Sequence, residues 1–120
     1  MAKNLQISYL LDFYGSMLTE KQRIVIEYYY NDDLSLAEIA DNEGITRQGV
    51  HDAVKRAETQ LLELEERLGL AKRFEMMRTG LKKIQTAAAD IQNYNERLVR
   101  AEEINSKVNE IMRIAVELCD

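Results

Sequence analysis

The chain contains no proline in 120 residues, and it has only five glycines. Proline ends or kinks helices and glycine weakens them, so long helices meet few interruptions in this sequence. Alanine, leucine, glutamate, lysine, arginine, glutamine and methionine, which lose little rotamer freedom in a helix, are abundant. The sequence therefore predicts an all-α protein before any motif is considered.

Charge and hydropathy narrow the class of protein further. The formal net charge is −5, which disfavours non-specific nucleic-acid binding over the whole surface but leaves room for a local basic face. No apolar run approaches the roughly 20 residues of a membrane span, and residues 1–5 lack the apolar stretch of a signal peptide. Cys119 is the single cysteine, which suits a reducing cytosol. We therefore expect a cytoplasmic protein without membrane insertion.

Two helices are predicted before residue 31. The spacing of Ile7, Leu11, Tyr14 and Leu18 follows one helical stripe. A second helix is expected to begin after Thr19, which forms a capping-box pattern with the glutamine three residues later. Its expected core face is Ile24, Val25, Tyr28 and Tyr29. Two of the three tyrosines at 28–30 are expected in the core, although such a run could also stack on bases.

A short helix, a turn with glycine and a longer helix follow, which is the pattern of a helix-turn-helix. Ser35 opens the short helix, expected over Leu36 to Asp41, and Gly44 supplies the positive φ of the turn. Thr46 caps a long helix whose apolar rhythm continues until Gly69. The predicted core of the helix-turn-helix is Leu36, Ile39, Ala40, Gly44, Ile45, Val50 and Val54.

In a helix-turn-helix, the start of the second helix enters the DNA major groove. The outward positions that we expect to contact bases are Arg47, Gln48, His51, Asp52 and Lys55. Arginine can bind guanine and glutamine can bind adenine through paired hydrogen bonds, whereas an aspartate repels phosphate unless it accepts from cytosine. Thr46 and Arg56 are expected to hold phosphates. The alternative is that the three helices form only a structural core or a protein-docking surface.

The blocks Leu18-Thr19-Glu20-Lys21-Gln22, Leu36-Ala37-Glu38-Ile39-Ala40 and Gly44-Ile45-Thr46-Arg47-Gln48 resemble region 4 of bacterial sigma factors. More closely, together with Asp12-Phe13-Tyr14, the run from Tyr28 to Ala40 and the run from Arg47 to Arg56, they resemble the YlxM family. The resemblance covers about Asp12 to Leu68 and implies a sigma-like trihelical core without a wing. One departure is Glu43, which stands where such motifs usually place an apolar residue, and we expect this side chain to be exposed.

The resemblance also implies a bacterial cytosolic regulator that acts in the signal recognition particle pathway, since members of the family are encoded beside the genes of that particle's GTPase. From the residues and the resemblance together, we predict a DNA-binding protein of transcription regulation. Components of the signal recognition particle and RNA polymerase are the protein partners considered. The alternative is an adaptor that binds protein or RNA through its helical surfaces.

Residues 70–120 are predicted to be a separate helical region for packing or dimerisation, after a helix-turn-helix bundle at 1–69. Its apolar stripes must be buried either against the bundle or against another copy, and we predict a homodimer through residues 70–118. A break in the helix is expected at Asn93-Tyr94-Asn95. A basic cluster at the start of this region is either a secondary nucleic-acid patch or a solvated helix face. Its members are Lys72, Arg73, Arg78, Lys82 and Lys83.

The sequence offers little for catalysis. We find no glycine-rich phosphate loop, no metal-ligand spacing and no strained nucleophile turn. His51 is the only histidine and lies far in sequence from Cys119. We therefore expect no enzymatic activity, no catalytic residue, no metal and no cofactor.

Overall fold

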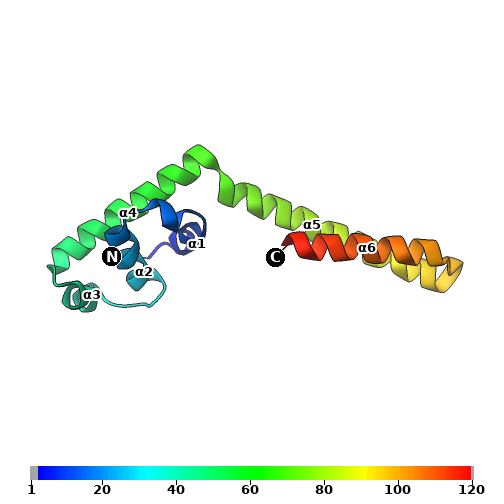
Figure 1. The fold of residues 1–120 in the computed structure, drawn as a ribbon, viewed down its shortest axis with the longest axis horizontal. Helices are drawn as coiled ribbons and strands as arrows, with labels where there is room; N and C mark the ends of the chain where they lie inside the picture. The colour runs from blue at the N-terminus through cyan, green and yellow to red at the C-terminus, as the bar shows by residue number, and fades with distance from the viewer. Residues whose placement is uncertain (1–2, 120) are drawn as a thin grey trace. The chain divides into compact units, whose positions relative to one another are not determined.

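The computed structural model describes residues 3–119, and every regular element in that range is helical. The chain divides into two compact units, Met1–Lys72 and Arg73–Asp120. The elements in chain order (Figure 1) are α1 (Leu5–Tyr14), the 3-10 turn η1 (Gly15–Met17), α2 (Glu20–Tyr30), α3 (Leu36–Glu43), α4 (Arg47–Leu68), α5 (Leu70–Tyr94), the π-helical turn η2 (Asn95–Val99) and α6 (Glu102–Cys119). The prediction of an all-α protein is confirmed.

Side chains at the helix starts select where each helix of the first unit begins. Asn4 caps α1 by accepting a hydrogen bond from the backbone N–H of Gln6 at 3.0 Å. Thr19 caps α2 and accepts from the N–H of Gln22, whose side chain accepts in return from the N–H of Thr19. These reciprocal bonds satisfy N–H groups that have no partner within the helix. The predicted capping box at Thr19 is confirmed.

The core of the first unit consists of two clusters, and α2 contributes to both. The first cluster lies between α1, α2 and α4 and contains Ile7, Leu10, Leu11, Tyr14, Leu18, Ile26, Ala57, Leu61 and Ala71. The second lies between α2, α3 and α4 and contains Val25, Tyr29, Ile39, Ala40, Val50 and Val54. The first-helix stripe predicted at Ile7, Leu11, Tyr14 and Leu18 is therefore confirmed as core.

The expected core face of α2 was wrong in part. Val25 and Tyr29 are buried as expected, but Ile24 and Tyr28 are only half-buried. Ile26 is fully buried, although the single-stripe pattern leaves it out. Because α2 packs against α1 on one side and α3 on another, its buried surface is wider than one stripe.

The second unit is a hairpin of α5 and α6, which run side by side in Figure 1. The turn lies later than the predicted break at Asn93-Tyr94-Asn95, because the chain stays helical to Val99 and reverses at Arg100, whose φ is 56°. Asn95 is 4% exposed, and its side chain bonds both the carbonyl and the N–H of Ala101. Asn95 therefore closes the turn from inside the helix. No helix between residues 3 and 119 is long and apolar enough to cross a membrane.

Candidate nucleic-acid interface

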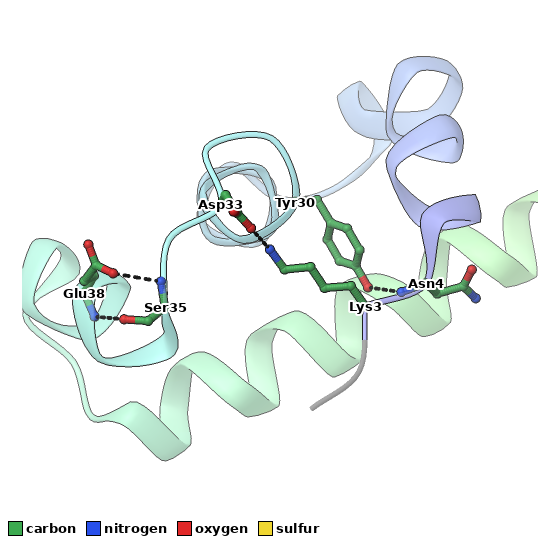
Figure 2. A network of polar contacts seen from close by, with 6 residues as sticks. All are labelled: Lys3, Asn4, Tyr30, Asp33, Ser35 and Glu38. Carbon is green, nitrogen blue, oxygen red and sulfur yellow. Dashed lines mark hydrogen bonds and ion pairs between the residues drawn. The ribbon is translucent and has the colours of Figure 1, made fainter.

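The turn between α3 and α4 has the geometry that the glycine pattern predicts. α3 begins at a capping box between Ser35 and Glu38, drawn in Figure 2. It ends at Gly44, which has a φ of 67° in the left-handed region that favours glycine. The N–H of Ile45 then donates to the carbonyl of Ala40 at 3.2 Å. This bond closes the end of α3 and redirects the chain into α4.

The start of α4 is capped by Thr46, whose hydroxyl accepts from the N–H of Gly49 at 2.9 Å. The same hydroxyl keeps its own proton, which can be donated to a phosphate oxygen. A Cβ at Gly49 would lie 3.1 Å from the Thr46 hydroxyl, so glycine at this position gives the cap its space. Gly49 was not singled out from the sequence, although it stands at the third helical position after a threonine cap.

The structure brings the residues predicted to contact DNA together on the first three turns of α4. Arg47, Gln48, Asp52 and Lys55 are exposed, and His51 is half-buried. Both predicted phosphate contacts, Thr46 and Arg56, are exposed as well.

Of the residues predicted as the helix-turn-helix core, four are buried: Ile39, Ala40, Val50 and Val54. Leu36 and Ile45 are partly buried and pack against this group, while Gly44 lies exposed in the turn. The neighbouring Glu43, expected to be exposed, is half-buried.

Asp52 makes two contacts within this face. Its carboxylate accepts a hydrogen bond from the side-chain amide of Gln48 at 3.1 Å, one helical turn away. It also lies 3.6 Å from the Nδ1 atom of His51. Because the amide N–H of Gln48 is engaged by Asp52, the carboxylate orients Gln48 in the free chain. The spacing of four residues could have revealed this pair.

Lys55 lies beside a polar chain that continues into the body of the unit. Its ammonium is 3.8 Å from the carboxylate of Glu58, which is also hydrogen-bonded by the Tyr30 hydroxyl at 2.9 Å. That hydroxyl in turn accepts from the backbone N–H of Asn4 at 3.3 Å (Figure 2). Burial raises the pKa of Tyr30 to about 12. The hydrogen bond from Asn4 acts to lower this pKa, whereas the hydrogen bond to Glu58 acts to raise it. Sequence analysis missed this link between the N-terminal segment and α4.

The segment before α1 is held to the turn after α2. Lys3 forms an ion pair with Asp33, as Figure 2 shows, and its ammonium lies 4.6 Å from the ring centre of Tyr29. The hydrogen bond and charge of Lys3 lower the pKa of the Asp33 carboxyl. Asp33 also has a positive φ of 56°, a conformation that aspartate tolerates better than most residues. These contacts support the loop that leads into α3.

A shallow groove extends the candidate interface along α4. It is lined by Lys55, Arg56 and Arg67 together with polar side chains and Glu63. Three cations along one groove suit the backbone of a nucleic acid, where phosphates repeat at regular intervals. Arg67 also lies in the last turn of α4, where a positive charge interacts favourably with the helix dipole.

The predicted secondary patch at the start of α5 is exposed but not gathered on one face. Lys72 belongs to the first unit, whereas Arg73, Arg78, Lys82 and Lys83 belong to the second. At about 100° per residue, Arg78 lies about 140° around α5 from Arg73. Within residues 3–119 there is also no group of three or more histidine, cysteine, aspartate or glutamate side chains placed to hold a metal ion.

Comparison with known proteins identifies the family. The family model described as "Putative helix-turn-helix protein, YlxM / p13 like" matches residues 1–111. A UPF0122 protein of Shouchella clausii is 49% identical over 90 residues, which cover 75% of this chain and 83% of the relative. A UPF0122 protein of Bacillus cereus is 38% identical over 109 residues, which cover 91% and 99%. The chain therefore belongs to the UPF0122 family of YlxM / p13-like helix-turn-helix proteins.

Proposed function

We propose that this chain is a non-enzymatic DNA-binding regulator of the cytoplasm, which inserts the start of α4 into the major groove. The observation that carries the proposal is the exposure of Arg47 and Gln48 in the first turn of a helix that follows a left-handed glycine. A recognition helix meets base edges with its N-terminal residues. The supporting core beneath this turn is buried, so the two side chains project from a fixed base.

The other residues at the start of α4 are proposed to make different contacts with DNA. His51 and Lys55 lie near base edges, and Thr46 and Arg56 hold phosphates on either side. Asp52 approaches the bases with the Gln48 amide that it orients, and it favours a cytosine amine over an acceptor. A negative charge on the DNA-facing side of α4 lowers the affinity for DNA of every sequence, and so increases selectivity.

The proposal includes two further parts that rest on the family resemblance and the apolar stripes. The regulated process is the signal recognition particle pathway, and the helix-turn-helix is of the sigma region 4 type. The active form is a homodimer through residues 70–118, because helix-turn-helix proteins usually bind two half-sites related by a twofold axis. Lys72 to Lys83 are a secondary contact to nucleic-acid phosphates.

A fluorescence anisotropy titration against a pool of genomic DNA fragments tests the proposal, at low and at physiological salt. Saturable, sequence-selective binding that weakens with salt is the expected result, since phosphate contacts release counterions. Absence of binding at micromolar protein overturns it and favours an adaptor that binds protein. Equal binding to RNA and DNA of every sequence would instead assign the activity to the cations of α5.

A further inference from the structure

Where the helices of the α5–α6 hairpin meet, the apolar side chains that are fully buried are small. Ala88, Val108 and Ala115 are each no more than 3% exposed. The contact is completed by hydrogen bonds from the Gln92 amide to Asn105 at 3.4 Å and to Asn109 at 3.0 Å. A hairpin closed by such small residues buries little of the large apolar surface that its sequence carries.

Twelve large apolar side chains of the hairpin remain exposed, and six of them repeat every seven residues, three on each helix. We call these six the apolar face: Met77, Ile84 and Ile91 on α5, with Ile104, Ile111 and Leu118 on α6. Their exposed fractions range from 37% to 61%. A seven-residue repeat of exposed apolar residues is the pattern of a helix that packs along another helix.

The register of the hairpin puts these six residues at three matching levels. The bonds of Gln92 to Asn105 and of Asn95 to Ala101 fix an antiparallel register. In that register Met77 lies level with Leu118, Ile84 with Ile111, and Ile91 with Ile104.

On each helix the middle residue of the apolar face lies four residues before a buried alanine. Ile84 precedes Ala88 in α5, and Ile111 precedes Ala115 in α6. Antiparallel helices with the same offset present their stripes on the same side of the hairpin. Several side chains turned away from this side are polar and exposed, among them Thr86, Asn93, Ser106 and Arg113. The hairpin is therefore amphipathic as a unit.

We infer that the apolar face is covered by the apolar face of a second copy of the chain, which makes a four-helix bundle of two hairpins. The six side chains expose on the order of 500–600 Å², most of the roughly 800 Å² that each partner contributes to a standard interface. Gly80 and Ala87 flank the stripe of α5, and a Cβ at Gly80 would meet no atom within 4 Å. Large residues beside such small ones leave holes into which the side chains of a partner helix can fit.

This inference deepens the homodimer of the proposed function by naming its surface, and it does not depend on DNA as the ligand. The test measures the molar mass of the full chain by light scattering at micromolar concentration. The wild type is expected at twice the chain mass. The double variant Ile84→Glu/Ile111→Glu is expected at the mass of one chain, because four carboxylates would be buried in the dimer. The matched control Thr86→Glu/Ser106→Glu, which adds the same charges away from the apolar face, is expected to stay dimeric.

A second pair of variants distinguishes loss of the dimer interface from misfolding. Ile84→Ala/Ile111→Ala is expected to raise the dimer dissociation constant at least tenfold in sedimentation, whereas Thr86→Ala/Ser106→Ala leaves it within about twofold. Circular dichroism of each variant is expected to show unchanged helix content in the monomer. A monomeric wild type, or alanine variants that dimerise like their controls, would overturn the inference. The same samples titrated with DNA separate the two proposals, since a monomer that binds DNA refutes only the interface.

Discussion

The hydroxyl of Tyr14 in α1 donates a hydrogen bond of 2.6 Å to the carboxylate of Glu65 near the end of α4. The same carboxylate accepts from the backbone N–H groups of Ala71 and Lys72, each at 3.0 Å. The N–H of Leu70 donates to the Tyr14 hydroxyl at 3.1 Å. Together the two side chains satisfy three N–H groups at the start of α5, where the helix itself provides no acceptors. Tyr14 is fully buried, so this link is part of the core of the first unit.

Replacement of Glu65 by glutamine is expected to lower the free energy of unfolding by about 1–3 kcal/mol. The change removes a charged acceptor from hydrogen bonds with a buried hydroxyl and two helix-start N–H groups. Urea denaturation followed by far-ultraviolet circular dichroism measures the loss. Glu66→Gln is the matched control, because Glu66 is exposed and its replacement should change stability by less than about 0.5 kcal/mol. Equal midpoints for the two variants would contradict the role of Glu65.

Stability is expected to fall on acidification through Glu65. Burial acts to raise the pKa of this carboxyl, but the hydrogen bonds from Tyr14, Ala71 and Lys72 outweigh burial and lower the pKa from its ordinary 4.5. The unfolded chain then binds the proton more readily than the folded chain does. The contribution of Glu65 is therefore complete above about pH 5 and is lost as the pH falls through the lowered pKa. Urea midpoints at pH 7 and pH 3.5 should differ more for the wild type than for Glu65→Gln, and parallel shifts would refute this.

The turn of the helix-turn-helix is expected to need glycine at position 44 because of the backbone conformation there, and not because a side chain would lack space. Nothing lies within 4 Å of a Cβ at Gly44, but its φ is 67°. Gly44→Ala is therefore expected to cost about 1–2 kcal/mol from left-handed strain alone. Gly44→Asn should cost less, since asparagine visits this conformation more readily. Thermal unfolding of both variants gives the comparison, and an asparagine variant no more stable than the alanine variant would argue against backbone strain.

Much of the fold follows from local sequence signals, and each incorrect prediction has a physical cause. The capping boxes at Thr19 and Ser35 and the glycines at 44 and 69 locate helix ends because they satisfy local backbone groups. Ile26 was missed because its burial depends on how α2 packs between two neighbours. The turn at Arg100 was placed too early because Asn95, a residue typical of turns, acts here from inside the helix.

The candidate site was less predictable than the helices that carry it. The exposure of Arg47 and Gln48 follows from the periodicity of α4, since Val50 and Val54 mark its buried side. The pairing of Gln48 with Asp52 depends on side-chain rotamers, and the link from Glu58 to Tyr30 depends on tertiary packing. Periodicity carries no information on either.

Arg56 is expected to act on a phosphate and not on a base. Arg56→Gln should weaken binding to all DNA sequences by a similar factor, and it should reduce the slope of log affinity against log salt by about 0.9. Titrations of one selected fragment and one unrelated fragment at several salt concentrations measure both effects. A loss confined to the selected fragment would assign Arg56 to base recognition instead.

Base recognition by the first turn of α4 is measured by the affinity of Arg47→Ala for a selected genomic fragment. Arg113→Ala is the matched control, because it removes an exposed arginine from α6 and so changes net charge equally. Arg47→Ala is expected to lose about 1–3 kcal/mol of binding free energy, roughly 5- to 150-fold in affinity, and to relax specificity at one base pair. Arg113→Ala should bind within about twofold of the wild type. Equal affinities of the two variants for every fragment would contradict base recognition by Arg47.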